Sequence, residues 1–310
     1  MVTVTEHTTT HPVELVSAAH LPSELRDLEH LMFANGDVQL HAVAAGPSEG
    51  PVLLLLHGFP EFWYGWRKQI PALAAAGFRV IVPDGRGYNI SNKPKGAASY
   101  RLRHLVSDVV AIIEQLGRAR VYLVGHDWGA IVAWAVAAAH KEKVARLAIL
   151  NVPHPGVMFR FLLTHPNQLR RSWYMFFFQM PRVPEFFFAA WNFRSGIQSL
   201  VRTSRPGTFS PEDLSVYRSA WAQPGAVTAM IHWYRALFRY PSSFRVGRIE
   251  VPTRILWGKK DAFLLPGLAK ASLRKCDRAE VLWFDRATHW LHLEQPYAVN
   301  SALIEFFWAH

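Results

Sequence analysis

The sequence predicts an α/β protein with a mostly parallel, eight-stranded sheet, helices on both faces of the sheet, and an α-helical lid inserted after the sixth strand. Three observations support this class. Strand-like apolar runs alternate with helical patterns along most of the 310 residues, as in sheets built from parallel strands. The alternation stops between about Pro153 and Arg245, where aromatic residues are dense. Half of the residues are hydrophobic, so the chain has the material for a deep core.

We expect the chain to divide into three parts. Residues 1–22, which are rich in Thr and His, predict a loosely held tail. Residues 23–152 and 247–310 predict the α/β core, and residues 153–246 predict the lid. Twelve aromatic residues lie between Phe159 and Phe193. Most of them are expected to hold the lid together, and roughly a quarter or fewer to face a ligand, because binding sites are small relative to domains.

The first elements of the core are two strands joined by a tight turn. His30–Ala34 and Val38–Val43 have strand composition, and the sequence Asn35-Gly36-Asp37 between them is typical of hairpin turns. Pro51–Leu56 is a continuous apolar run, which indicates a strand buried on both faces. The chain then continues with a predicted helix at Phe62–Ala76 and a predicted strand at Phe78–Pro83.

The remaining core elements continue the alternation. Tyr100–Leu116 has helical spacing and is followed by Gly117, a residue that favours helix termination. Further predicted strands are Arg120–Val124, Val144–Leu150, Thr253–Trp257 and Val281–Phe284, and further predicted helices are Gly129–His140, Pro266–Lys275 and Pro296–Ala309. Parallel strands end at a common edge of the sheet, and open α/β sheets bind their ligands at that edge.

Charge and cysteine content exclude several classes of protein. Lys and Arg outnumber Asp and Glu by 34 to 23, but the basic residues are scattered and form no run of five to eight. We therefore expect a cationic surface and no nucleic-acid partner. Cys276 is the only cysteine, which excludes an intramolecular disulfide.

The sequence also predicts a location and a simple chemistry. The first residues lack the pattern of a signal peptide, and no stretch of about 18 uncharged apolar residues occurs, so we expect a cytoplasmic protein without membrane insertion. No H-E-x-x-H motif, Cys/His cluster with ligand spacing or Walker loop is present. No metal or cofactor is therefore expected.

The most informative motif is Gly125-His126-Asp127-Trp128-Gly129. It follows an apolar strand and precedes a helix, with the G-x-nucleophile-x-G spacing of a nucleophile elbow. The nucleophile position holds Asp127 instead of Ser. A carboxylate that attacks a saturated carbon leaves an ester that water can cleave, whereas a serine would leave a stable ether. Asp127 therefore indicates displacement at an sp³ carbon, as in an epoxide or an alkyl halide.

Two partners for Asp127 follow later strands. Asp261 lies in the loop that follows Thr253–Trp257, at a strand's carboxyl end, where a turn or cap role is an equal alternative. His289 follows Val281–Phe284 and is preferred over His292 because it lies closer to the strand end. The order nucleophile, acid, histidine is that of the α/β hydrolases and differs from that of other triad folds.

An oxyanion hole is expected beside the nucleophile. The loop His57-Gly58-Phe59-Pro60 follows the predicted strand at Pro51–Leu56, and the residue after the nucleophile is Trp128. The backbone N–H groups of Phe59 and Trp128 are the candidate donors. Pro60 has no N–H, and a cis Phe59–Pro60 bond fits a tight turn there. His57 is expected to brace this loop by hydrogen bonds.

From about residue 25 to residue 308 the chain resembles the epoxide hydrolases of the α/β-hydrolase fold. The resemblance rests on four segments, which are His57–Tyr88 (HGFPEFWYGWRKQIPALAAAGFRVIVPDGRGY), Gly125–Ala130 (GHDWGA), WGKKD ending at Asp261, and THWLHLEQP from Thr288 to Pro296. Three positions differ from the family's usual residues. Asn89 stands where Gly is usual, Gly85 replaces a common Leu, and Thr288 stands where Gly usually precedes the histidine.

The lid adds two residues to the site by this resemblance. Tyr174 begins a stretch similar to the family's Y-x-x-x-F-Q-x-P, and Tyr234 lies in its W-Y-R. In the family such tyrosines donate to the epoxide oxygen, and two phenols suit this task because an alkoxide leaves only when acids donate to it. The family analogy also assigns Phe59, Trp63 and Trp128 to the substrate pocket.

The resemblance implies an enzyme that converts an apolar epoxide and water into a vicinal diol, without metal or cofactor, as a monomer or homodimer. Two alternatives remain at this stage. The GHDWG motif also fits haloalkane and haloacetate dehalogenases, although fluoroacetate dehalogenases carry a His-Trp pair where this chain has Tyr174 and Met175. The second alternative is a noncatalytic protein of the same fold that binds a small molecule. The complete set of nucleophile, acid, base and two tyrosines argues against this alternative.

Overall fold

The computed structural model describes residues 21–309, and nearly all of the tail expected at residues 1–22 lies outside them. The described chain forms one sheet in the order β1-β2-β4-β3-β5-β6-β7-β8. The strands are β1 (Glu29–Asn35), β2 (Val38–Ala45), β3 (Val52–Leu56), β4 (Arg79–Pro83), β5 (Val121–His126), β6 (Val144–Leu150), β7 (Thr253–Gly258) and β8 (Ala279–Phe284).

The sheet is mostly parallel, as predicted. Strand β2 runs antiparallel to both β1 and β4, while every pairing from β4 through β3, β5, β6 and β7 to β8 is parallel. The predicted hairpin joins β1 to β2, and Asn35 pairs with Val38 across its turn. This order brings the carboxyl ends of β3, β5, β7 and β8 to one edge of the sheet.

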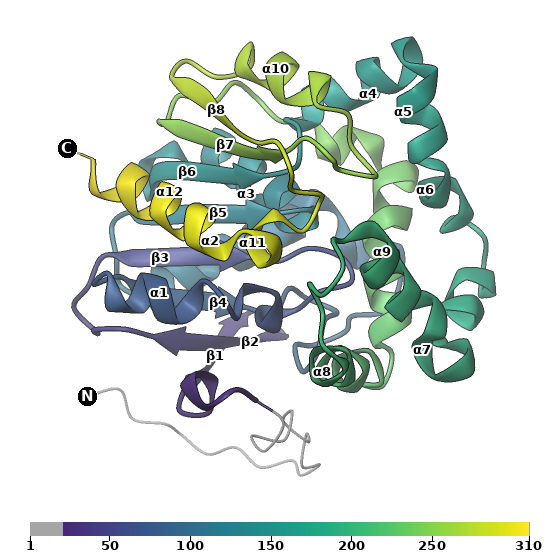
Figure 1. Ribbon diagram of the computed structural model, residues 1–310, viewed down its shortest axis with the longest axis horizontal. Coiled ribbons are helices and arrows are strands. Elements are labelled where there is room, and N and C mark those ends of the chain that lie inside the picture. The colour runs from purple at the N-terminus through teal and green to yellow at the C-terminus, as the bar shows by residue number, and fades with distance from the viewer. Residues whose placement is uncertain (1–20, 310) are drawn as a thin grey trace.

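Helices cover both faces of the sheet (Figure 1). Helices α1 and α12 lie on one face and α2 and α3 on the other. The core helices are α1 (Ile70–Ala75), α2 (Leu102–Gln115), α3 (Trp128–Ala139), α10 (Gly267–Leu273), α11 (Leu291–Glu294) and α12 (Pro296–Trp308).

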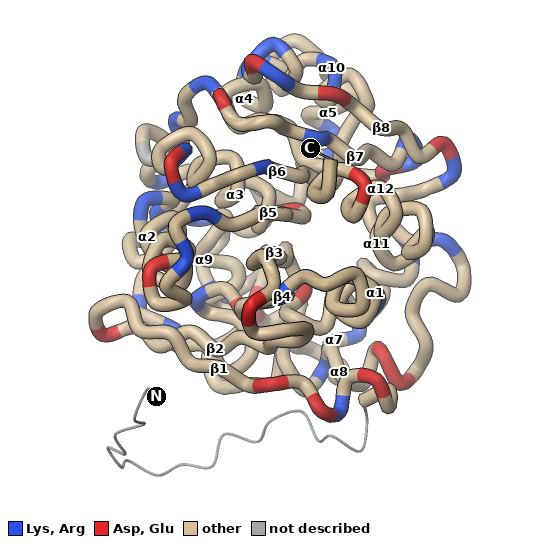
Figure 2. The backbone as a smooth tube through the Cα atoms, turned by 90° about the vertical axis from the view of Figure 1, so that its left-hand side faces the viewer, with Lys and Arg blue, Asp and Glu red and all other residues tan. Residues whose placement is uncertain are grey.

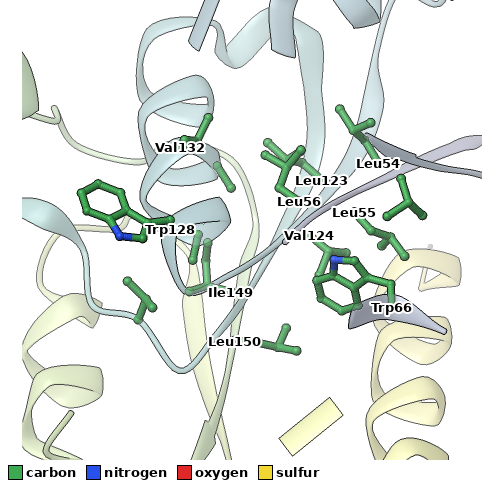
Figure 3. Close-up of a cluster of buried hydrophobic side chains, with 14 of the residues drawn as sticks. Leu54, Leu55, Leu56, Trp66, Leu123, Val124, Trp128, Val132, Ile149 and Leu150 are labelled. Atoms are coloured by element: carbon green, nitrogen blue, oxygen red, sulfur yellow. The ribbon is translucent and has the colours of Figure 1, made fainter. Parts of the chain in front are cut away.

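The central strands are apolar on both sides. All five residues of β3 are buried, and each face packs against helices or aromatic side chains. Figure 3 shows Leu56 and Leu123 on the side of Val132, and Leu55 and Val124 on the side of Trp66. Charged residues lie mostly around this centre in Figure 2. A continuous apolar run in the sequence therefore corresponds to a strand enclosed on both faces.

One predicted helix is wrong in its extent. Phe62–Ala76 was expected to be continuous, but the chain forms a 3₁₀ turn at Trp63–Trp66 and then the short helix α1. Pro71 stands in the first turn of α1, where its missing N–H and fixed φ are tolerated, and a proline in a helix interior is disfavoured. The break places Trp63 and Trp66 in the core.

A helical insertion lies between β6 and β7, as expected after the sixth strand. Its helices are α4 (Pro155–Thr164), α5 (Pro166–Arg171), α6 (Trp173–Phe177), α7 (Val183–Thr203), α8 (Pro211–Trp221) and α9 (Ala226–Arg239). They gather beside one edge of the sheet in Figure 1. Helix α7 is interrupted at residues 190–193, where Trp191, Asn192 and Phe193 have positive φ. Within residues 21–309, no helix is both long enough and apolar enough to cross a bilayer.

Candidate active site

Asp127 stands on a sharp turn between β5 and α3. Its backbone has φ 50° and ψ −122°, a conformation that non-glycine residues rarely adopt and that is typical of strained functional turns. The turn also requires small neighbours. A Cβ on Gly129 would lie 2.2 Å from the carbonyl oxygen of Leu56, and one on Gly125 would lie 2.6 Å from Cα of Ala130. The side chain of Asp127 is 16% exposed, so it is accessible at this turn.

The structure brings Asp127, Asp261 and His289 together. Nδ1 of His289 lies 2.8 Å from Oδ2 of Asp261, and Nε2 lies 3.5 Å from Oδ2 of Asp127. The second oxygen of Asp261 accepts hydrogen bonds from the backbone N–H groups of Phe263 and Leu264, at 2.7 and 3.0 Å. Asp261 therefore has both of the roles considered from the sequence. One oxygen stabilises the turn, and the other contacts His289.

The charges of these three residues are coupled. Burial disfavours a charged His289, but the carboxylates of Asp261 and Asp127 outweigh it and raise the pKa of His289 to about 10. Burial likewise opposes ionisation of Asp127, yet His289, His126 and the Phe59 amide hold the pKa of Asp127 below its ordinary value. At neutral pH the site thus contains an imidazolium between two carboxylates.

The loop after β3 supplies a donor to Asp127. The backbone N–H of Phe59 donates to Oδ1 of Asp127 at 2.7 Å. This approach requires glycine at position 58, because a Cβ there would lie 2.2 Å from Cβ of Asp127. The Phe59–Pro60 bond is cis, as the sequence suggested.

His57 braces the same loop, as expected. Nδ1 of His57 donates to the carbonyl of Gly58 at 2.9 Å, and the backbone N–H of Gly85 donates to Nε2 at 3.0 Å. Burial lowers the pKa of His57. The ring is therefore neutral, with one nitrogen donating and the other accepting.

Two tyrosines from the insertion face Asp127. Tyr174 lies on α6 and Tyr234 on α9, with ring centroids 5.8 Å apart. Burial raises the pKa of both phenols, and the negative charge of Asp127 raises it further. Both tyrosines therefore keep their protons at neutral pH and can donate them.

Trp128 and Phe59 lie beside this pair, whereas Trp63 has other neighbours. The ring of Tyr234 is 4.9 Å from that of Trp128 and 5.3 Å from that of Phe59. Trp63 is buried and packs against the ring of Tyr64, and its backbone N–H donates to Asp84. Its proposed place in the substrate pocket stays a prediction.

A buried polar cluster lies behind His289 and was not anticipated from the sequence. Nδ1 of His126 lies 2.8 Å from Glu61, and Nε2 lies 3.0 Å from the carbonyl oxygen of His289. Both contacts are satisfied together only when both ring nitrogens carry protons. Burial opposes the charge on Glu61, but His292 and His126 hold the pKa of Glu61 well below its usual range. Two sequence positions could have pointed to this cluster. Glu61 directly follows Pro60 in the loop after β3, and His126 directly precedes Asp127.

His292, the alternative to His289, belongs to this cluster. Its Nε2 lies 3.5 Å from Glu61, and burial lowers the pKa of His292 to about 4. Glu61, His126 and His292 have potential ligand atoms within 4.8 Å of one another. Glu61 is already engaged by His126 and by the hydroxyl of Tyr217, at 2.8 and 3.2 Å. A metal ion there would have to replace these hydrogen bonds.

Thr288 fixes the loop that carries His289. Its backbone N–H and its hydroxyl donate to the two oxygens of Glu294, at 2.8 and 2.6 Å. Its carbonyl accepts from the side chain of Asn151 at 2.8 Å, and the same side chain accepts from the Gly258 N–H at 2.6 Å. The unusual Thr288 thus ties the histidine loop to α11, and Asn151 ties it to β6 and β7.

Comparisons with known proteins place this geometry in a family. Residues 51–296 match the family described as alpha/beta hydrolase fold. Protein YfhM of Bacillus subtilis, named as an AB hydrolase superfamily protein, is 42% identical over 87% of this chain and 94% of its own length. Epoxide hydrolase 2 of Caenorhabditis elegans is 38% identical over 92% of this chain and 81% of its own length.

A solved structure gives the same result in three dimensions. The crystal structure of Bacillus megaterium epoxide hydrolase with an inhibitor superimposes with a TM-score of 0.81 and 32% sequence identity. The superposition covers 89% of this chain and 99% of that one.

Proposed function

This chain belongs to the epoxide hydrolases of the alpha/beta hydrolase fold family, and on that premise we propose that it opens the epoxide through a covalent ester on Asp127. The supporting observation is that the two oxygens of Asp127 face different partners. Oδ1 accepts from the Phe59 N–H at 2.7 Å, and Oδ2 lies 3.5 Å from Nε2 of His289. One oxygen is thus held in place, and the other is available as the nucleophile.

The first step is the attack of Asp127 on a ring carbon of the epoxide. The new bond joins Oδ2 to that carbon, and the carbon–oxygen bond of the ring breaks. The alkoxide takes a proton from Tyr174 or Tyr234, whose phenols stay protonated at neutral pH for the reasons given above. General acid catalysis of this kind contributes about 10²–10⁴-fold in rate.

Ester formation prepares the histidine for the second step. The carboxylate charge of Asp127 helps to raise the pKa of His289 to about 10, and the ester is neutral. The pKa of His289 therefore falls once the ester forms, and the ring can return a proton to the tyrosinate. Neutral His289, held by Asp261, is then a base for water.

The second step is hydrolysis of the ester. His289 takes a proton from water, and the resulting hydroxide attacks Cγ of Asp127. Negative charge develops on Oδ1, where the Phe59 N–H already points and where the Trp128 amide is the second candidate donor. Each such donor contributes about 3–4 kcal/mol in comparable sites. The bond between Cγ and Oδ2 then breaks, the departing alkoxide takes the proton of the former hydroxide, and the diol leaves with Oδ2. The oxygen from water stays on the restored carboxylate of Asp127, and His289 is again protonated.

The same reasoning extends to partners and location. An apolar epoxide suits the aromatic rings of Phe59, Trp128, Tyr174 and Tyr234 that surround Asp127. We propose residence in the cytoplasm, where the single, buried Cys276 needs no oxidising environment, and a monomer or homodimer as the assembly.

A trapping experiment tests the proposed intermediate. The variant His289→Gln keeps Asp127 and the two tyrosines but lacks the base, so one equivalent of styrene oxide should remain bound to the protein. Intact-protein mass spectrometry measures the adduct, and fragmentation assigns it to a residue. The variant Asp127→Asn is the control and should form no adduct. An adduct on another residue, or full turnover by His289→Gln, contradicts the proposal.

A further inference from the structure

The outer face of the insertion exposes an unusual amount of aromatic surface. Its members are large apolar side chains of α6, α7, α9 and the loop between α6 and α7, each between 39% and 66% exposed. We call this set the aromatic face, and it consists of Trp173, Phe176, Met180, Phe186, Phe187 and Phe238. Scattered apolar residues are common on protein surfaces, but a continuous patch marks an interaction site.

Ring contacts join the aromatic members of this face into two groups, which meet at the neighbouring residues Phe176 and Phe177 of α6. In the first group, the ring of Phe177 lies 6.0 Å from the ring of Trp173 and 6.2 Å from the ring of Phe187. The ring of Phe187 lies 5.8 Å from the ring of Phe186. In the second group, the ring of Phe176 on α6 lies 5.2 Å from that of Phe238 on α9. In Figure 1, α6 and α7 lie along the outer edge of the insertion, away from the sheet.

Exposed arginines flank members of this face in the sequence. Arg170 precedes Trp173, Arg182 lies between Met180 and Phe186, and Arg239 follows Phe238, all three exposed. Within the described part of the chain, none of these three arginines pairs with a carboxylate. The nearby Glu185 is taken by Arg235, at 2.5 and 2.9 Å.

The excess of positive charge is concentrated in the insertion. Residues 153–246 contain eleven arginines and no lysine, against three acidic residues. They therefore hold eight of the chain's eleven excess positive charges. Aromatic side chains bordered by arginines are typical of protein surfaces that lie on a membrane containing anionic lipids.

We infer that the aromatic face docks onto the surface of an anionic phospholipid membrane. The aromatic rings enter the boundary between headgroups and acyl chains, and Arg170, Arg182 and Arg239 contact lipid phosphates. A second copy of the chain fits this face poorly, because two such faces would bring unpaired arginines together without an acidic partner. This docking is peripheral and requires no helix that crosses the bilayer.

Helix α6 connects the docking face to the site. Trp173 and Phe176 point outward from it, whereas Tyr174 and Phe178 contact the rings of Tyr234 and Phe59, at 5.8 and 5.4 Å. If the proposed function holds, a docked enzyme has its epoxide site one short helix away from the lipid. Apolar epoxides dissolved in the bilayer are then the substrate class favoured by this arrangement.

Vesicle binding tests the inference directly. The full chain is sedimented with vesicles of phosphatidylglycerol and phosphatidylcholine in equal parts, and with vesicles of phosphatidylcholine alone. We expect binding to the anionic vesicles that weakens as salt increases. The variant Phe186→Ser/Phe187→Ser should lose most of this binding. The variant Arg182→Glu/Arg239→Glu should reduce it more than tenfold, since each basic residue near an anionic surface contributes about fivefold.

Variants at exposed positions of the core, outside the insertion, provide the controls. Tyr297 on α12 is 87% exposed, and Lys68 is exposed without a carboxylate partner among the described residues. Tyr297→Ser and Lys68→Glu should bind vesicles like the unmodified protein. All these variants should hydrolyse a water-soluble epoxide at the same rate as the unmodified protein. Equal rates show that the variants are folded. They also separate failure of docking, which is a loss of vesicle binding, from failure of the proposed function, which is a loss of epoxide hydrolysis.

Two results would overturn the inference. One is equal binding of the unmodified protein and the Phe186→Ser/Phe187→Ser variant to anionic vesicles. The other is a protein that dimerises in sedimentation analysis, becomes monomeric in this variant, and does not bind vesicles. The aromatic face would then be an interface between two copies of the chain.

Discussion

At the scale of single residues, the site depends on how charge is distributed around Asp127. His289 contacts two carboxylates and Asp261 accepts two backbone N–H groups, so the charged groups of the triad are paired. Tyr174 and Tyr234 are different, because they lie near the same negative charge and remain neutral. A neutral acid next to a nucleophilic carboxylate is the combination that epoxide opening requires.

Removal of the tyrosine hydroxyls tests their role as acids. We expect Tyr174→Phe and Tyr234→Phe each to lower kcat for styrene oxide by about 10–100-fold, because the remaining phenol still donates. The double variant should lose far more and should fail before the ester forms. Rapid-quench experiments measure the rate of ester formation. The variant Phe178→Leu is the packing control, because it disturbs the aromatic rings around Asp127 but removes no hydroxyl. A double variant with normal ester formation would exclude these acids.

Sequence predicted most of these residues but not all of their contacts. The elbow glycines and strand ends pointed to Asp127, Asp261 and His289, and the family resemblance pointed to Tyr174 and Tyr234. The contact of Glu61 with His126 could not be predicted, because it joins the loop after β3 to the end of β5 and depends on burial. Thr288 is a further example, since its bonds to Glu294 appear only when α11 is in place.

At the scale of elements, the loops at the carboxyl edge of the sheet place the reactive groups. The sequence predicted each strand to within a few residues, because the apolar runs of β3, β5 and β6 are clearly bounded. It failed at Phe62–Ala76, where Pro71 starts a new helix, and it did not predict α11. Helices of the insertion are harder to bound, because aromatic residues there serve both packing and the outer surface.

The elbow gives a sharp prediction at this scale. Gly129→Ala places a Cβ 2.2 Å from the Leu56 carbonyl, so the backbone of β3 or α3 must move. We expect a loss of several kcal/mol in the free energy of unfolding, of the order seen for severe steric substitutions. Urea denaturation measures it.

Gly247→Ala is the matched control for this variant. Among residues 21–309, no atom lies within 4 Å of a Cβ built at Gly247, and the φ of Gly247 is not positive. Its unfolding free energy should change by less than about 0.5 kcal/mol. Equal stability of the two variants would contradict the close packing described for the elbow.

At the scale of the whole molecule, the site combines groups from separate parts of the chain. Asp127, Asp261, His289 and Phe59 come from the core, whereas Tyr174 and Tyr234 come from the insertion. The division into a core at residues 23–152 and 247–310 and a lid at residues 153–246 stays a prediction, although helices α4–α9 do lie between β6 and β7. Composition predicted a basic protein but not the concentration of arginines around one aromatic face, which depends on how α6, α7 and α9 pack.

Buried titrating groups predict how stability depends on pH. Burial lowers the pKa of His292 and of His154 from 6.5 to about 4. Between pH 6.5 and pH 4 the unfolded chain therefore binds more protons than the folded chain, and stability falls as pH falls. The lowered pKa values of Glu61 and Asp127 act in the same direction below their ordinary range. His289 acts oppositely, since its stabilisation is complete below about pH 6.5 and is lost as pH rises towards 10.

Stability should therefore be greatest near neutral pH. Each buried histidine with a pKa near 4 contributes about 3 kcal/mol to the loss of stability in acid. Thermal melting from pH 4 to pH 10 measures the curve. The same scan in about 0.5 M salt screens surface repulsion from the net positive charge and should leave the acid loss largely intact. A flat melting temperature between pH 7 and pH 4 would contradict the assigned protonation states.

The account depends most on the covalent step at Asp127, and oxygen labelling in a single turnover measures that step. Enzyme in excess over styrene oxide reacts in water enriched in ¹⁸O, and mass spectrometry locates the label. We predict that the first diol carries no ¹⁸O and that the peptide containing Asp127 gains one labelled oxygen. A labelled first diol with an unlabelled Asp127 peptide would show that water attacks the epoxide directly.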